Sequence, residues 1–183
     1  MSRVLVIFAS EEGQAAKIAR RIAEHIREAG YEVALRDATK PDPGANLAAY
    51  DGVVIGSAIH YGHHAKPVLA LVKDHRAILH TRHTAFFSVS LSAGGPHRDP
   101  AAAKSYLEAF TAEADWKPDV ATSFAGAIRH SRYGIFKTIL VRLSLRKSGP
   151  PPEPGDHEYT DWKAVADFAE AFAKRIATPK RGF

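Results

Sequence analysis

The stretch "VLVIFASEEGQAAKIARRIAEHIREAG" (Val4–Gly30) contains the pattern that decides the fold. Its first part, Val4–Phe8, is a continuous apolar run, which is typical of a parallel strand buried on both faces of a sheet. After a polar loop, isoleucines recur every four residues (Ile18, Ile22, Ile26), as on the buried face of an amphipathic helix. The glycine that ends the stretch stands where helices commonly end. The stretch therefore predicts a strand, a loop and a helix that packs back on the sheet.

The same alternation of strands and helices continues along the chain. Four further strands are expected, at Tyr31–Arg36, Gly52–Gly56, His83–Ser90 and Val120–Ile128. Helices are expected over about Pro67–Ala77, from Pro100 onward, and after Thr160, which we expect to cap the last helix. This alternation predicts a doubly wound parallel α/β sheet, and five strands favour the flavodoxin-like order 2-1-3-4-5. We expect one domain over residues 1–183, with an insertion at about 129–155 before the last helix.

Composition and charge narrow the function classes. The chain has no cysteine, which excludes disulfides, thiolate metal sites and cysteine nucleophiles. It has no secretory signal and no apolar run of about 18 residues, so we expect a cytoplasmic protein. The net charge is +5, and six of the 25 Lys and Arg residues lie in the acid-free window 120–152. The remaining 19 are matched by 20 acidic residues, so the positive balance is local and indicates an acidic ligand or surface.

The loop after the first strand, "SEEGQA" (Ser10–Ala15), is a candidate phosphate site. The amino end of the following helix offers backbone N–H groups, Ser10 a hydroxyl, and Gly13 close approach. The side chains of Glu11 and Glu12 are compatible with an anion if they point to solvent. The chain lacks the glycine motifs of nucleoside-triphosphate and dinucleotide sites, which favours a monophosphate. An ordinary strand–helix turn is the alternative.

The stretch "GSAIHYGHH" (Gly56–His64) follows the third strand, and we expect a loop over Ser57–His63. Its aromatic and imidazole side chains are suited to the wall of a flat ring. Three histidines in five positions also suggest a metal, but no further ligand stands at a suitable spacing, so we expect none. A polar rim loop remains the alternative.

The stretch "FFSVSLSAGGPHRDP" (Phe86–Pro100) contains the third expected loop, Ser88–His97. Its serines and glycines offer hydroxyl and backbone groups to the edge of a heteroatom-rich ring. Hydrolysis by Ser90, His97 and Asp99 is disfavoured because no G-x-S-x-G turn is present.

These stretches, together with "AGAIRHSRY" and "YTDW", resemble the oxygen-independent, menaquinone-dependent protoporphyrinogen IX dehydrogenases of bacteria. The resemblance covers nearly the whole chain. It implies a flavodoxin-like fold, an FMN cofactor and an inserted basic segment. One departure is Ala15, which replaces the threonine usual at the end of a flavodoxin phosphate loop. The lost hydroxyl contact is worth about 0.5–1.5 kcal/mol, so we expect weaker FMN binding.

The resemblance also implies which residues bind FMN. The phosphate would lie on Ser10, Glu11, Glu12, Gly13, Gln14 and Ala15. The ring would lie between two further groups, Ser57, Ala58, Ile59, His60, Tyr61 and Gly62 on one side and Ser88, Val89, Ser90 and Leu91 on the other. No side chain identifies itself as a catalytic base; the candidates by position are His60, His63 and His97.

The insertion combines six basic residues with an apolar helical arc in Ile135–Leu145. The basic residues are Arg129, Arg132, Lys137, Arg142, Arg146 and Lys147. They suit the propionates of a porphyrinogen, or an anionic membrane surface that brings the protein to a quinone. Packing against the sheet or a second copy of the chain, in a homo-oligomer, is the alternative. Aromatic residues are sparse here, so nucleic acid is not expected as a partner.

We therefore expect an enzyme that oxidises protoporphyrinogen IX to protoporphyrin IX with FMN, in heme biosynthesis. Electrons would pass to a membrane quinone, either menaquinone or ubiquinone, with the cytoplasmic protein peripherally bound to the inner membrane. Two rival functions remain open. One is a flavodoxin that carries electrons between proteins, and the other is an NAD(P)H:quinone reductase.

Overall fold

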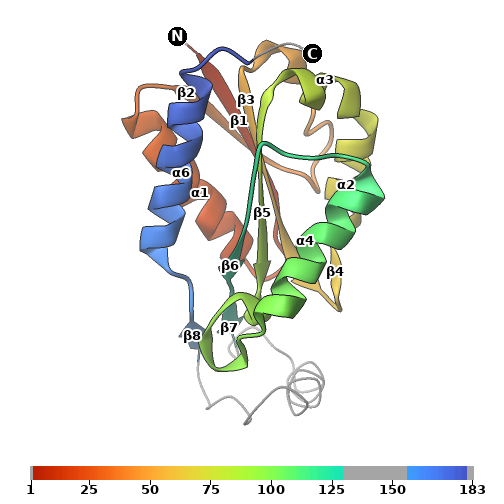
Figure 1. Cartoon of the computed structure of the whole chain (residues 1–183), viewed down its shortest axis with the longest axis vertical. Coiled ribbons are helices and arrows are strands. Elements are labelled where there is room, and N and C mark those ends of the chain that lie inside the picture. The colour runs from red at the N-terminus through yellow and green to blue at the C-terminus, as the bar shows by residue number, and fades with distance from the viewer. Residues whose placement is uncertain (1, 130–155, 181–183) are drawn as a thin grey trace.

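The computed structural model describes residues 2–129 and 156–180. Its main sheet has the order β2-β1-β3-β5-β6, which confirms the flavodoxin-like prediction. These strands are β1 (Arg3–Ala9), β2 (Glu32–Asp37), β3 (Gly52–His60), β5 (His83–Ser90) and β6 (Val120–Ala125). All four pairings along this order are parallel. The carboxyl ends of the strands therefore meet at one edge, at the bottom of Figure 1, while both termini lie at the other end.

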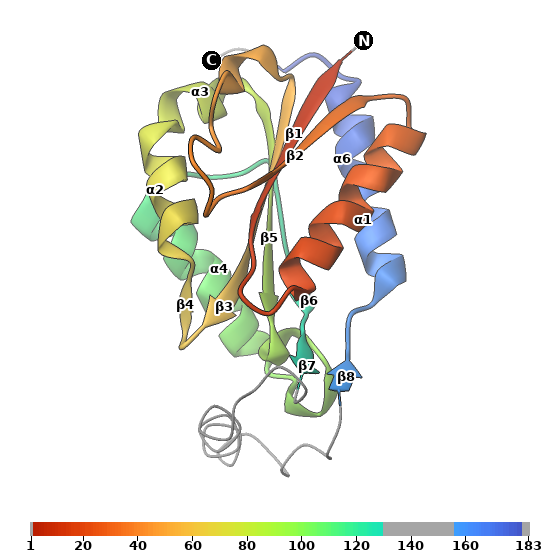
Figure 2. The same cartoon turned by 180° about the vertical axis from the view of Figure 1, so that it is seen from behind.

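Helices cover both faces of the sheet (Figures 1 and 2). One face carries α1 (Gln14–Glu28) and α6 (Trp162–Ile176). The other carries α2 (Lys66–Asp74), α3 (Arg76–Thr81) and α4 (Pro100–Ala114). Three short 3-10 helices are η1 (Leu47–Ala49), η2 (Leu91–Ala93) and η3 (Gly95–His97).

The apolar patterns correspond to two cores, one on each side of the sheet. Val4 and Val6 of β1 pack in the core beneath α1 and α6, while Leu5 and Ile7 pack in the core beneath α2–α4. All four are fully buried, which explains why this strand is apolar at every position. The expected helical face of α1, with its three isoleucines, is fully buried as well. Burial on both sides makes the sheet a rigid support for its edge.

Several expected boundaries were wrong, and most differ because of pairings distant in sequence. Residues Ser57–His60, expected as loop, continue β3. Ser57 and Ala58 still pair with the parallel neighbours of β3, and Ile59 and His60 pair antiparallel with β4 (His63–His64). The strand expected at His83–Ser90 is confirmed as β5, so the loop expected over Ser88–His97 begins only after Ser90. The expected strand Val120–Ile128 is interrupted at Gly126, after which β7 (Ala127–Arg129) pairs with β8 (Asp156–Glu158).

Two helix predictions also need correction. The expected helix Pro67–Ala77 is divided, because α2 ends at Asp74 and α3 begins at Arg76. The residue that caps α6 is Asp161, whose carboxylate accepts a hydrogen bond from the backbone N–H of Ala164 at 3.0 Å. Thr160, the expected cap, is buried, and its hydroxyl donates to the backbone carbonyl of Ala125 instead.

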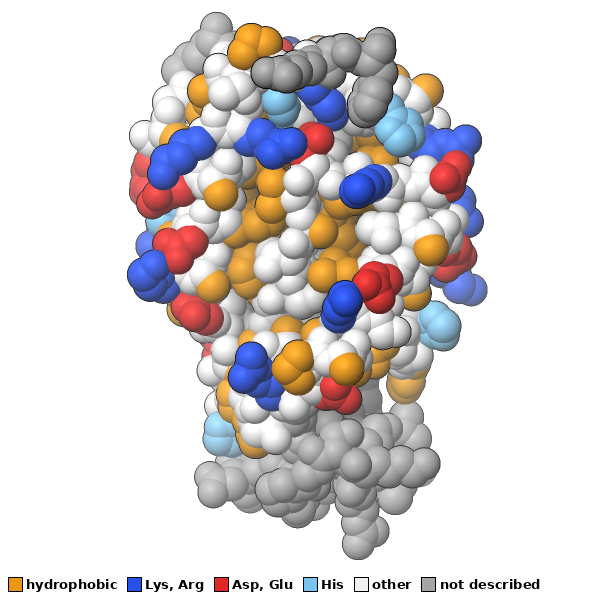
Figure 3. Space-filling view, in the orientation of Figure 1, with side chains coloured by type: hydrophobic (Ala, Val, Ile, Leu, Met, Phe, Trp, Pro, Cys, Tyr) orange, Lys and Arg blue, Asp and Glu red, His pale blue; other side chains and the backbone are white. Residues whose placement is uncertain are grey.

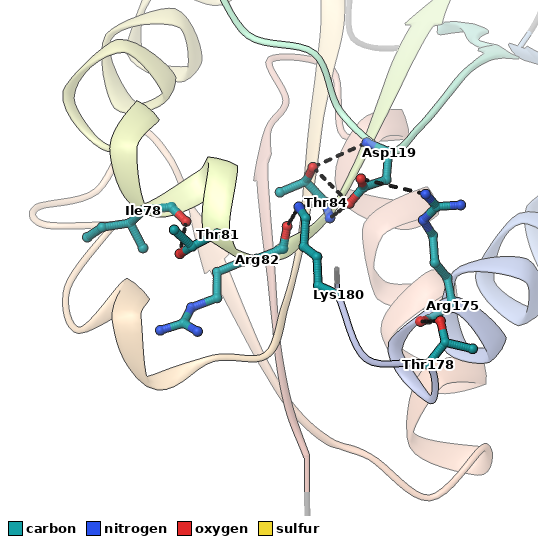
Figure 4. A network of polar contacts seen from close by, with 8 residues as sticks. All are labelled: Ile78, Thr81, Arg82, Thr84, Asp119, Arg175, Thr178 and Lys180. Carbon is teal, nitrogen blue, oxygen red and sulfur yellow. Dashed lines mark hydrogen bonds and ion pairs between the residues drawn. The ribbon is translucent and has the colours of Figure 1, made fainter. Parts of the chain in front are cut away.

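The chain that follows α6 is fixed at the amino-terminal edge of the sheet (Figure 4). The Asp119 carboxylate accepts a hydrogen bond from the backbone N–H of Thr84 at 2.7 Å. Lys180 approaches the same carboxylate at 3.2 Å and Arg175 at 3.7 Å, and Lys180 also donates to the carbonyl of Arg82. These contacts hold the segment after α6 against the start of β5.

Candidate functional site

A cavity of about 1100 Å³ lies at the carboxyl edge of the sheet. We call it the carboxyl-edge cavity. It is lined by the ends of β1, β3 and β5 and by the segments that follow them, which is where ligands bind in open α/β sheets. Of the predicted cofactor residues it brings together Ser10, Glu11, Glu12, Gln14, Ala15, Ala58, Ile59, His60, Tyr61, Gly62, Val89, Ser90 and Leu91. Gly13, Ser57 and Ser88 are not part of the lining, and the two serines are fully buried.

The Ser10–Ala15 loop is shaped by Gly13. Gly13 has a φ of 93°, a left-handed conformation that glycine adopts at little cost, and it stands at the cap position of α1. Its backbone N–H donates to the hydroxyl of Ser10 at 3.0 Å, which closes the turn. The amino end of α1 is thereby directed at the cavity, and the first N–H groups of a helix have no acceptor within it.

The phosphate-loop candidate is also linked to the next strand. His60 Nε2 lies 3.1 Å from a carboxylate oxygen of Glu11, whose side chain is 62% exposed. Glu11 therefore extends toward solvent and pairs along the rim, and its charge does not occupy the interior of the loop.

The β3–β4 hairpin carries an aromatic residue at its tip. Its two turn residues, Tyr61 and Gly62, both have positive φ, 48° and 82°, as a type I′ hairpin turn requires. Such a conformation is uncommon for tyrosine. The Tyr61 side chain is 69% exposed and its ring lies 4.3 Å from that of His60. The hairpin thus holds a tyrosine beside the cavity mouth.

The hairpin is anchored to the sheet by His64. Its Nε2 lies 2.9 Å from Ser88 Oγ, and its ring packs against Phe86 and Phe110. Burial, and secondarily the charge of His63, lowers the pKa of His64 from 6.5 to about 4. The imidazole is therefore neutral at physiological pH.

Sequence reasoning identified His60 and His63 as candidates and missed the anchoring role of His64. Both named histidines line the cavity. The pattern that could have revealed His64 is the Tyr61-Gly62 turn, since it pairs Ile59 with His64 and so places both on the inward face. His97, the third candidate, belongs to η3.

Two buried serines support the same region. Ser57 Oγ accepts a hydrogen bond from the backbone N–H of Ala65 at 3.0 Å, which holds the start of α2 against β3. Ser90 is only 7% exposed and lines the cavity, yet its Oγ has no hydrogen-bond partner among the described residues. A buried hydroxyl without a partner is costly, so Ser90 Oγ is suited to form a hydrogen bond with a ligand atom.

Asp99 has a structural role rather than a place in a hydrolytic triad. Its carboxylate caps α4 by accepting a hydrogen bond from the backbone N–H of Ala102.

Gln14 connects the phosphate-loop candidate to the last helix. Its side-chain amide donates to Thr160 Oγ1 at 2.8 Å, and that hydroxyl donates to the carbonyl of Ala125 at 2.7 Å. Both side chains are buried. The loop is therefore fixed relative to the end of β6, a constraint that sequence reasoning did not find.

Charge is evenly distributed over the visible flanks of the molecule. In Figure 3, basic and acidic side chains alternate over α6 and α4, and hydrophobic side chains are visible between them. Of the basic residues predicted to act on substrate or membrane, Arg129 contributes its backbone to β7. The others, Arg132, Lys137, Arg142, Arg146 and Lys147, lie outside the described residues, as does most of the expected insertion.

Two further properties concern metal and membrane. Within residues 2–129 and 156–180, no group of three or more His, Asp or Glu side chains is placed to hold a metal ion. In the same part of the chain, no helix combines the length and apolarity needed to cross a bilayer.

Known proteins resemble this chain in sequence and in fold. The family model for the flavodoxin domain matches residues 5–153. The protoporphyrinogen IX dehydrogenase (quinone) of Escherichia coli K12 is 31% identical over 178 residues, covering 97% of this chain and 98% of that protein. Oxidised flavodoxin 1 of Bacillus cereus superposes with a TM-score of 0.59 at 21% identity, over 94% of this chain and 98% of that one.

A flavoprotein of Lactobacillus acidophilus NCFM, solved in complex with FMN, superposes with a TM-score of 0.50 at 20% identity, over 67% of this chain and 93% of that one. The two solved structures share the fold, and the Escherichia coli protein confirms the family inferred from the loops. The chain therefore belongs to the flavodoxin-domain family and, within it, to the protoporphyrinogen IX dehydrogenases.

Proposed function

We propose that this chain oxidises protoporphyrinogen IX to protoporphyrin IX with FMN, and that a quinone accepts the electrons. The observation that supports this most strongly is the match to the Escherichia coli enzyme, which extends over nearly the full length of both chains. The match therefore also includes the part of the chain that follows the flavodoxin domain matched over residues 5–153.

The residues around the carboxyl-edge cavity fit FMN. Gly13 gives the loop a left-handed turn that directs the amino end of α1 at the cavity, where the helix dipole and N–H groups favour a phosphate. Ser90 offers a buried hydroxyl that lacks a hydrogen-bond partner among the described residues. The ring would lie between the Ala58–Gly62 and Val89–Leu91 segments, which both line the cavity.

Within this site the chain's residues bind, orient and shield, while bound FMN supplies the two-electron redox chemistry. Ala58, Ile59 and Val89 provide apolar walls that exclude water from the ring faces. His60 and His63 are the imidazoles at the cavity available to accept protons from the substrate. His64 is held neutral and orients the hairpin that carries them.

The test is anaerobic mixing of the FMN-loaded protein with protoporphyrinogen IX, followed by flavin absorbance. We expect the oxidised flavin band to bleach, because FMN takes up two electrons, and to return when menaquinone is added. Full conversion to protoporphyrin removes six electrons, so protoporphyrin fluorescence should appear only with excess menaquinone, which reoxidises the flavin after each two-electron step. NADPH in place of the porphyrinogen is the control. Bleaching by NADPH but not by porphyrinogen would identify a pyridine-nucleotide quinone reductase and would refute the proposal.

The quinone requires access to a membrane, and the basic segment is suited to provide it. Six Lys and Arg residues with no acid between 120 and 152 attract an anionic lipid surface. The enzyme then remains peripheral and meets its quinone at the membrane.

A further inference from the structure

The carboxyl-edge cavity is larger than one flat cofactor requires. Its volume of about 1100 Å³ exceeds the usual range for a single small ligand, about 300–1,000 Å³. Its lining also continues past the residues predicted to hold FMN. The additional residues include His63, Lys66 and Pro67 around the start of α2, together with Ser92 and Tyr106. We call this part the α2–α4 end of the cavity.

The residues of the α2–α4 end come from elements that pack together. The ring of Phe110 on α4 lies 4.9 Å from the ring of His64. Tyr106 stands one helical turn before Phe110 and so on the same side of α4, while Lys66 follows His64 by two residues. Figure 2 shows β4, α2 and α4 on the same side of the sheet. Lys66 and Tyr106 therefore face one space from two elements.

Lys66 is suited to bind an anionic ligand. It is the only Lys or Arg in the described lining of the cavity. Its ammonium forms no ion pair or hydrogen bond with a described residue, whereas six other described lysines are ion-paired. It also occupies the first turn of α2, which contains no acidic residue, although the helix dipole disfavours a cation there. Lys66 is exposed, so its place in the cavity lining is what distinguishes it from an ordinary solvated lysine.

The rest of the α2–α4 end suits an apolar ligand with a polar edge. Pro67 and the ring of Tyr106 offer apolar surface, and the half-buried Tyr106 has a hydroxyl with no hydrogen bond to a described residue. A carboxylate could accept from this hydroxyl and from the Lys66 ammonium together. A tetrapyrrole with propionate side chains has both an apolar body and carboxylates at one edge.

We infer that the α2–α4 end binds the porphyrinogen, with Lys66 and Tyr106 holding one of its propionates. The inference rests on the proposed function and adds to it the residues that select a carboxylated tetrapyrrole. It places the substrate next to the predicted FMN ring, within the same cavity. It also assigns recognition to described residues of the fold, in addition to any role of the basic segment.

The experiment compares Lys66→Met with the matched control Lys117→Met in the FMN-loaded protein. Lys117 is also exposed and unpaired among the described residues, but it lies beyond the far end of α4. We would titrate protoporphyrin IX and its dimethyl ester by fluorescence, and measure KM and kcat for protoporphyrinogen IX. Lys66→Met should raise the Kd for protoporphyrin IX and the KM about fivefold, the size of a partly exposed ion pair. Lys66→Arg should restore both values, and kcat and FMN content should not change.

The ester separates a charge contact from a packing contact. Because it carries no carboxylate, it should bind the wild type and Lys66→Met equally. Equal Kd values of Lys66→Met and Lys117→Met for the free acid would overturn the inference and leave the proposed function intact. A wild-type protein that neither binds protoporphyrin IX nor oxidises the porphyrinogen would instead refute the proposed function, and the inference with it.

Discussion

His64 Nε2 and Ser88 Oγ lie 2.9 Å apart, and this contact fastens the β3–β4 hairpin to the neighbouring strand β5. The residues on either side of it, Tyr61 at the hairpin tip and Ser90 at the strand end, both line the carboxyl-edge cavity. The contact therefore fixes the distance between the two segments proposed to flank the FMN ring.

The buried His64 should make stability depend on pH. Folding lowers its pKa from 6.5 to about 4, so between these values the unfolded chain binds more protons than the folded one. The contribution of neutral His64 to the free energy of unfolding is fully present above about pH 6.5. As the pH falls toward 4, the protein loses roughly 2–3 kcal/mol of this stability. Urea unfolding of the wild type and His64→Leu at pH 7.5 and 4.5 would measure it, and His64→Leu should lose less stability on acidification. The exposed His80→Leu is the control, and it should retain the wild-type pH dependence.

Gly13 should be required for FMN binding, beyond its effect on stability. Gly13 and Gly30 have nearly the same φ, 93° and 92°, at opposite ends of α1. Alanine at either position should cost about 1–2 kcal/mol of folding free energy because a Cβ disfavours the left-handed region. Only Gly13→Ala should also weaken FMN binding, measured by quenching of flavin fluorescence, because Gly30 is remote from the cavity. Equal FMN affinity in the two variants would contradict the placement of the phosphate.

The buried Thr160 should link the last helix to cofactor binding. Thr160→Val keeps the shape but removes the hydrogen bonds with Gln14 and Ala125, at a cost of about 1–3 kcal/mol. We also expect weaker FMN binding, because Gln14 belongs to the phosphate loop. Thr178→Val, which removes an exposed hydroxyl bound to the carbonyl of Arg175, is the control. Thermal unfolding and FMN titration of both variants would separate the effects, and an unchanged FMN Kd in Thr160→Val would show that the loop does not depend on this contact.

The basic segment should bind anionic membranes. Reversing Arg142, Arg146 and Lys147 to Glu should abolish salt-sensitive binding to vesicles that contain phosphatidylserine, since each basic residue contributes about 1 kcal/mol at such a surface. Turnover with a soluble quinone should persist. The control reverses three exposed lysines on α4 and α6, Lys104, Lys163 and Lys174. Equal loss of vesicle binding in both triple variants would indicate a general effect of net charge.

Much of the fold could be predicted because the patterns that specify it are local. The apolar run Val4–Phe8 is continuous because both faces of β1 are covered, and the isoleucines of α1 recur because one face of that helix is buried. Each hydrophobic pattern is determined by the way in which its own element is buried. The order of strands and helices could therefore be predicted from the periodicity of apolar residues. The sheet order was predicted from the number of strands, because five strands that alternate with helices favour the flavodoxin-like order.

The details of the site depended on tertiary structure. Thr160 and Asp161 are adjacent, and both residue types are common helix caps. The Thr160 hydroxyl instead forms hydrogen bonds with Gln14 and Ala125, which are distant in sequence. Similarly, His60, His63 and His64 are equivalent in the sequence, and only the pairing of β3 with β4 turns His64 toward Ser88. The sequence by itself determined the parallel strands β1, β2, β3, β5 and β6, the helices between them, their order and the family-specific loops, because burial of each element imposes a short-range pattern. Only the tertiary structure decided which polar side chain meets which, because hydrogen bonding depends on distances between atoms that the chain brings together from far apart.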